Sequence, residues 1–152
     1  MLLKNESASL TLEFVNYEFP EAGAGADEYD RNWLLVRCTW VDEDGYTRKD
    51  SNACLLAQEL AGMTAGLKVL LAGIRDGYES DFIEPDFFLS ARAEGEGFRL
   101  SASFYLPNTM DGDDTAEVDC TLTGAELKAV IADLDSACAR LPERGAVKIW
   151  IC

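Results

Sequence analysis

Residues 32–41 form a strand-length segment that is apolar on both faces, which narrows the folds open to this chain. Apolar side chains recur at every second position, the period of a β-strand, at Leu34, Val36, Cys38 and Trp40. The alternate positions include Trp33, Leu35 and Val41, so the second face is half apolar as well. A strand of this kind belongs in the middle of a sheet that is covered on both sides.

A tight turn and then a helix are predicted after this segment. The sequence Asp42-Glu43-Asp44-Gly45 is typical of a hairpin turn, because an Asp-Gly pair tolerates positive φ angles. Residues 46–49 can return as a short strand, and Asp50 or Ser51 can cap a helix that ends near Gly73. A continuous apolar stripe at helical spacing indicates that helix, at Leu56, Leu60, Met63, Leu67 and Leu70.

The remaining chain alternates between strand and turn patterns before a second helix. Strands are predicted over residues 9–19, 81–93, 98–106 and 116–122, with loops at 20–30, 94–97 and 108–115. The apolar face of the first of these strands changes midway, which indicates a bulge. Pro107 is expected to end the third of them. Thr123 and Glu126 form a capping box for the second helix, which Pro142 is expected to stop.

These patterns predict an α+β fold in a single domain spanning residues 1–152. Successive strands are joined by hairpins, so the sheet is expected to be mainly antiparallel, with about five to six strands and two amphipathic helices packed on it. A domain of this length buries roughly 70% of its unfolded surface, which is enough for a core without disulfides or metals. The sequence contains no internal repeat.

The charge balance of the chain restricts its partners. Lys and Arg number 13 against 28 Asp and Glu, which gives a net charge of −15. Nucleic acid and anionic membranes carry the same sign, so direct binding to either is disfavoured. A basic protein partner is favoured, with electrostatically steered association. The alternative is that the acidic surface only keeps the protein soluble.

The residue types present exclude several kinds of chemistry. Without histidine, Ser-His-Asp and Cys-His nucleophilic sites are impossible. No phosphate-binding glycine loop is present, and no cofactor or metal is expected. The five cysteines are widely spaced, and the N-terminus lacks the apolar run of a signal peptide. These features predict a cytoplasmic protein whose reduced thiols serve as small apolar core residues.

Two acidic segments are the candidate sites. They contain Asp42, Glu43 and Asp44 in the first, and Asp111, Asp113 and Asp114 in the second. Paired carboxylates could serve a hydrolase or bind a divalent metal ion. The second segment does not keep the alternate ligand spacing of an EF-hand loop, however, and solvated acidic loops that contact a protein partner are the preferred interpretation. Tyr46 and Tyr105 are possible aromatic anchors beside them.

Several segments resemble the WapI-like immunity proteins, which are small bacterial proteins encoded beside polymorphic toxins. The resemblance lies in residues 17–20, in Asn32-Trp33-Leu34-Leu35-Val36, in residues 53–60, in residues 84–89 and in the capped last helix. It spans about residues 9–141 and leaves the C-terminal tail uncovered.

The resemblance implies a cytosolic protein that binds and neutralises a cognate toxin, often a nuclease, without catalysis. A carboxylate-based hydrolase or a metal-dependent enzyme remains the alternative function, and it rests on the acidic segments alone. The resemblance assigns no toxin-contacting residues, so the six acidic positions are predicted from charge.

Overall fold

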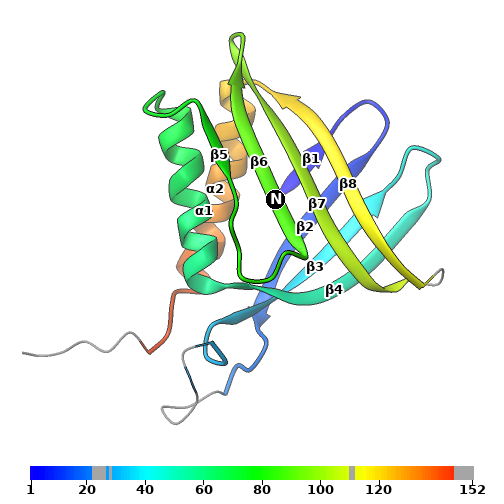
Figure 1. Cartoon of the computed structure of the whole chain (residues 1–152), viewed down its shortest axis with the longest axis vertical. Coiled ribbons are helices and arrows are strands. Elements are labelled where there is room, and N and C mark those ends of the chain that lie inside the picture. The colour runs from blue at the N-terminus through cyan, green and yellow to red at the C-terminus, as the bar shows by residue number, and fades with distance from the viewer. Residues whose placement is uncertain (22–26, 28, 110–111, 146–152) are drawn as a thin grey trace, which may run out of the picture.

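A computed structural model describes residues 1–21, 27, 29–109 and 112–145 (Figure 1). The first half of the chain contains β1 (Leu2–Lys4), β2 (Ser9–Tyr17), β3 (Trp33–Val41), β4 (Thr47–Leu56) and α1 (Ala57–Leu71). The second half contains β5 (Gly77–Glu79), β6 (Phe87–Glu94), β7 (Gly97–Thr109), β8 (Gly112–Leu122) and α2 (Gly124–Arg140).

The strands of the described residues form two four-stranded antiparallel sheets in chain order, β1-β2-β3-β4 and β5-β6-β7-β8. The predicted α+β class, antiparallel pairing and two helices are therefore confirmed, although the strands divide into two sheets. Figure 1 shows α1 and α2 side by side on one side of the sheets, with the β3–β4 hairpin extending toward the opposite side. No helix among the described residues is both long and apolar enough to cross a membrane.

One face of each sheet and one stripe of each helix build a common core. The predicted stripe on α1 is confirmed, because its side chains are almost completely buried at Leu60, Met63, Leu67 and Leu70. The stripe on α2 is buried in the same way at Leu127, Val130, Ile131 and Leu134. Gly73, with a backbone φ of +75°, follows α1 as predicted, and α2 ends at Arg140 just before Pro142.

The predicted start of α1 is wrong. Asp50 and Ser51 do not cap the helix, because they pair with Cys38 and Arg37 across the β3–β4 ladder. The ladder carries the chain in strand conformation as far as Leu56, and the helix begins only at Ala57. Cross-strand pairing thus overrides the local capping preference of an Asp-Ser pair.

Several strand boundaries also differ from the sequence prediction. The strand expected from residue 81 begins at Phe87, and residues 77–79, expected to be part of a polar connection, form the edge strand β5. Strand β7 continues past Pro107, where the register shifts between Leu106 and Thr109. A proline lacks a backbone donor, and such an irregularity tolerates it. Most of the expected acidic loop 108–115 therefore belongs to β7 and β8. The bulge predicted in β2 is confirmed between Phe14 and Asn16.

Candidate functional site

Asp42 organises the turn between β3 and β4. Its Oδ1 accepts hydrogen bonds from the backbone amides of Asp44, at 2.9 Å, and Tyr46, at 3.1 Å. The amide of Gly45, whose φ is +84°, donates to the Asp42 carbonyl oxygen at 3.0 Å. The predicted hairpin turn is confirmed, and its first aspartate is a structural residue of the turn.

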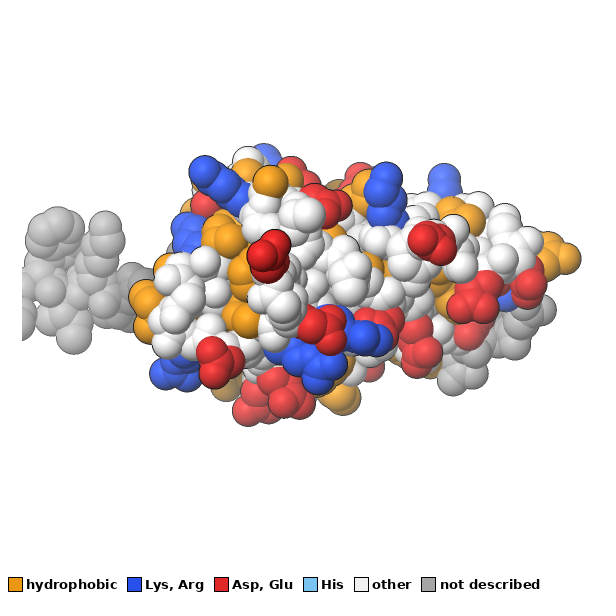
Figure 2. Space-filling view, turned by 90° about the horizontal axis from the view of Figure 1, so that it is seen from above, with side chains coloured by type: hydrophobic (Ala, Val, Ile, Leu, Met, Phe, Trp, Pro, Cys, Tyr) orange, Lys and Arg blue, Asp and Glu red, His pale blue; other side chains and the backbone are white. Residues whose placement is uncertain are grey.

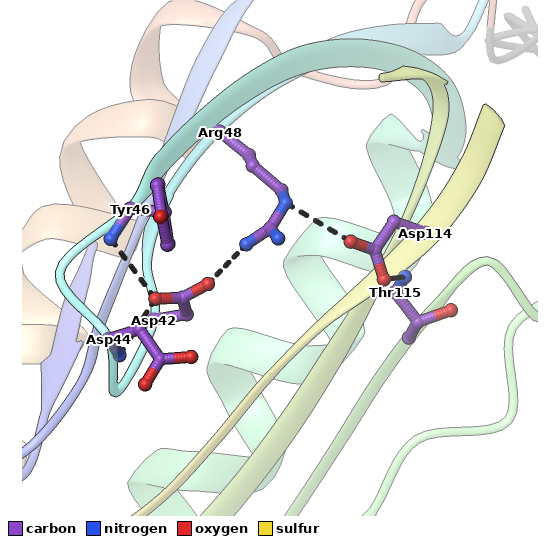
Figure 3. A network of polar contacts seen from close by, with 6 residues as sticks. All are labelled: Asp42, Asp44, Tyr46, Arg48, Asp114 and Thr115. Atoms are coloured by element: carbon purple, nitrogen blue, oxygen red, sulfur yellow. Dashed lines mark hydrogen bonds and ion pairs between the residues drawn. The ribbon is translucent and has the colours of Figure 1, made fainter. Parts of the chain in front are cut away.

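The structure connects the two acidic segments through a cation, Arg48 (Figure 3). Its Nη1 forms an ion pair with Oδ2 of Asp42, and its Nε lies 3.2 Å from Oδ2 of Asp114 on β8. The guanidinium also lies over the Trp40 ring, with Cζ 5.1 Å from the ring centroid. Arg48 therefore ties the β3–β4 hairpin of the first sheet to the start of β8 in the second.

The Arg48 side chain is only 24% exposed, and that of Asp42 is 14% exposed, so water screens this pair less than an ordinary surface ion pair. The hydrogen bond from Arg48 lowers the pKa of Asp42 from its ordinary value, and the amides of Tyr46 and Asp44 lower it further. Asp42 is therefore ionised at neutral pH and its charge is offset by Arg48. Because Arg48 also pairs with Asp114, the three side chains together keep one net negative charge.

The other predicted site residues differ in their surroundings. Glu43 and Asp44 are exposed on the turn, and Asp113 lies on β8. Asp111 lies outside the described residues. Tyr46 is 67% exposed, whereas Tyr105 is half-buried on β7. The ion pairs of Arg48 thus bring the two acidic segments together, and Figure 2 shows acidic side chains spread along the whole face seen from above.

The described part of the chain contains no cluster of three or more acidic or cysteine side chains placed to hold a metal ion. The thiols of Cys38, Cys54 and Cys120 are buried, as predicted for core residues. Burial raises the pKa of Cys38 and Cys54 to about 12 and that of Cys120 to about 11, so these thiols stay protonated and unreactive.

Sequence reasoning missed Arg48, although a signal for it exists. The Asp-Gly turn fixes the register of the hairpin, and that register places Arg48 directly across from Trp40. Pairing the predicted strand of residues 46–49 with residues 38–41 would have placed this cation beside an aromatic ring and close to the acidic turn. The contact with Asp114 is different, because it joins two sheets and depends on the packing of the whole molecule.

The site consists of charged surface residues on a buried apolar scaffold. A comparison of the sequence with family models identifies the family of the chain. The model of the family described as "Immunity protein WapI-like family" matches residues 1–142. The chain belongs to this family. Membership implies that the protein neutralises a cognate toxin, and it sets aside the hydrolase alternative, because this is a family of immunity proteins and not of enzymes.

Other comparisons add little to this assignment. No curated protein matches the chain. Among solved structures, the fold is similar to one described as the crystal structure of WHY1 from Arabidopsis thaliana, with 17% sequence identity and a TM-score of 0.48. That match covers 93% of this chain and 88% of the other.

Proposed function

We propose that this immunity protein neutralises a basic protein toxin in the cytoplasm by binding it directly through the acidic hairpin end. This name denotes the β3–β4 turn, residues 42–46, together with the adjoining start of β8 at residues 113–115. The observation that carries the proposal is the excess of acidic residues, a net charge of −15 in a member of an immunity family.

A nuclease is the toxin class that this charge fits best. Nucleases need a basic surface to hold the phosphates of their substrate, and an acidic inhibitor competes for that surface or excludes substrate beside it. The same charge makes nucleic acid and anionic membranes poor direct ligands. Long-range attraction would raise the association rate at low salt, whereas a few desolvated contacts would set dissociation.

The predicted acidic residues would have two different roles, one structural and one in contact with the toxin. Asp42 and Asp114 hold Arg48 and thereby fix the shape of the acidic hairpin end. Glu43 and Asp44 are exposed, and no ion-pair partner for either is found in the described part of the chain. They are the carboxylates that a basic surface would reach first, with Tyr46 as an exposed aromatic neighbour.

Stopped-flow association with the toxin domain encoded directly upstream tests this proposal across a salt series. The unmodified protein should associate more slowly as salt rises, and Glu43→Lys with Asp44→Lys should slow association and flatten that dependence. The matched control reverses two exposed acids near the β5 edge beside α1, Asp76→Lys with Glu79→Lys. It changes net charge equally and should have the smaller effect.

Two results would contradict the proposal. An association rate that does not respond to salt would remove the steering mechanism. The absence of a complex with any toxin encoded beside this protein would overturn direct binding itself.

A further inference from the structure

A groove of about 580 Å³ opens between the β3–β4 turn and strands of the second sheet. Residues 42–44 of the turn form one rim. The opposite wall crosses three strands, where Phe88, Ser103 and Glu117 are neighbours on β6, β7 and β8. The groove therefore adjoins the acidic hairpin end but is made mainly of the second sheet.

Acidic side chains dominate the lining, at Asp42, Glu43, Asp44, Glu117 and Asp119, and the lining contains no Lys or Arg. Two of these charges are offset by arginine side chains that do not line the groove. Asp42 pairs with Arg48, and Oδ2 of Asp119 lies 2.6 Å from Nη2 of Arg99. The other three have no ion-pair partner among the described residues, so the groove presents negative charge that the protein itself does not neutralise.

The groove also has an apolar part. Trp40 and Phe88 are half-buried lining residues, and Arg48 lies over the Trp40 ring. The indole Nε1 of Trp40 is buried and has no acceptor in the described part of the chain. A buried donor without an acceptor is destabilising, so the groove's role for Trp40 rests on its half-buried ring and not on this nitrogen, which is shielded from solvent.

Another hollow on the surface lacks this character. The one beside Met1 is lined by Arg37 and Arg140 as well as by Glu13 and Asp133. Its charges are mixed, so it offers no preference for a partner of one sign. Uniform charge combined with aromatic surface distinguishes the groove at the β3–β4 turn.

We infer that this groove receives an extended segment of the toxin that carries Lys or Arg side chains, an inference that rests on the proposed function. Long basic side chains have an aliphatic stem and a charged head. The stems would lie on Trp40 and Phe88, while the heads would pair with Glu43 and Asp44 on one rim and Glu117 on the other. The groove would thus supply the short-range contacts that slow dissociation after the acidic hairpin end has steered the encounter.

The test measures dissociation of the complex with the same upstream-encoded toxin domain. Glu117→Lys and, separately, Phe88→Ala should each weaken binding by about tenfold or more, chiefly through faster dissociation. Glu79→Lys makes the same charge change in the same sheet but outside the groove lining. It should change affinity by less than about twofold.

A milder variant and a second readout guard against misfolding. Glu117→Gln keeps the shape of the side chain and should give a smaller loss of the same kind. Hydrogen exchange of the unmodified protein should show that the toxin protects amides at residues 42–46 and 115–119, and leaves β5 unprotected. Unchanged dissociation in the groove variants, or protection confined to another surface, would overturn the groove while leaving the proposed function intact. No complex at all would instead overturn the proposed function.

Discussion

The two halves of the chain follow one plan in different sequences. Each half runs through four antiparallel strands in order and ends in a helix, β1–β4 with α1 and β5–β8 with α2. They differ in how the elements are joined. Helix α1 follows β4 without a break, whereas Thr123 separates β8 from α2. The first half has a long connection over residues 18–32, whereas β6 and β7 meet in a turn of two residues.

This difference separates what the apolar pattern decides from what the polar residues decide. Alternating strands and helical stripes are present in both halves, so both reach the same architecture although the sequence shows no repeat. The polar contacts are specific to each connection. The acidic turn belongs to the first half and the capping box to the second. The two halves therefore differ chiefly at the connections between their elements, which the common plan leaves free to vary.

The largest expected effect tests the equivalence of the two helices in the core. Leu67 on α1 and Leu134 on α2 are both fully buried. Replacing either by alanine should cost about 2–5 kcal/mol, because each leaves a cavity in the same core. Ile74→Ala is the control, since that side chain is 74% exposed and its truncation should cost about 0.5 kcal/mol or less. Urea denaturation midpoints unchanged by both core substitutions would refute this packing.

A smaller effect is expected at Arg144, which follows α2 and contacts the long connection of residues 18–32 in the first half of the chain. The Arg144 guanidinium donates to the carbonyl oxygens of Pro20 and Phe19, both at 2.9 Å, and to that of Arg31. It also stacks on the Tyr17 ring, with Cζ 3.7 Å from the centroid. Arg144→Ala should cost about 2 kcal/mol, because several charge-assisted hydrogen bonds are lost together.

Arg144→Lys sharpens the same experiment. Lysine keeps the positive charge but cannot reproduce the planar set of donors, so it should recover only part of the lost stability. Arg75→Ala is the control, since Arg75 is exposed and follows α1 at a distance from this connection. Full recovery by lysine would show that charge alone, rather than the directed hydrogen bonds, holds the connection.

Much of the fold could be predicted because its signals are local. The Asp-Gly turn, the stripe on α1, the bulge in β2 and the Thr123–Glu126 box each lie within one short segment. The start of α1 failed for the opposite reason. Asp50 resembles a helix cap locally, yet in the structure its carboxylate accepts a hydrogen bond from the Asn108 amide at 2.6 Å, across to β7. No pattern within one segment encodes a contact of that range.

The candidate site likewise has one part that could be predicted from sequence and another that could not. The composition of the acidic turn and its place between two strands could be read from sequence. The pairing of Asp42 and Asp114 through Arg48 could not, because it requires the two sheets to be in place. The same holds for the groove, whose aromatic residues Trp40 and Phe88 come from different sheets. The acidic composition predicted which segments would contact a partner, and the packing shows which of their carboxylates are already paired within the protein.

The capping box of α2 offers a third and smaller test. Thr123 Oγ1 accepts from the Glu126 amide at 3.1 Å, and Glu126 Oε1 accepts from the Thr123 amide at 3.0 Å. Thr123→Ala should cost about 1 kcal/mol, because one amide at the helix start loses its acceptor. Ser136→Ala removes a hydroxyl from the exposed middle of the same helix and should cost nothing. Superimposable urea unfolding curves for Thr123→Ala and the unmodified protein would show that the Thr123 cap does not stabilise α2.

The smallest effect concerns the dependence of stability on pH. The hydrogen bond from the Thr123 amide, with that from its hydroxyl, lowers the pKa of Glu126 below its ordinary 4.5. A carboxyl group whose pKa is lower in the folded state than in the unfolded state stabilises the fold above the unfolded value. That contribution disappears as the pH falls from about 4.5 through the folded pKa. Glu126→Gln should therefore flatten the decline of the unfolding free energy over this acidic range.

The control for that measurement is Glu96→Gln, which removes one negative charge from the exposed turn between β6 and β7. Both variants change the net charge equally, so a general charge effect would alter both curves alike. Only the loss of a carboxylate that accepts helix amides would separate them. At the start of α1 the corresponding carboxylate, Glu59, accepts from the Leu56 amide at 3.0 Å, but there is no hydroxyl cap beside it. A curve that is flattened by Glu126→Gln and not by Glu96→Gln would assign this acid sensitivity to the start of α2. Identical slopes for Glu126→Gln and the unmodified protein between about pH 3 and 5 would contradict it.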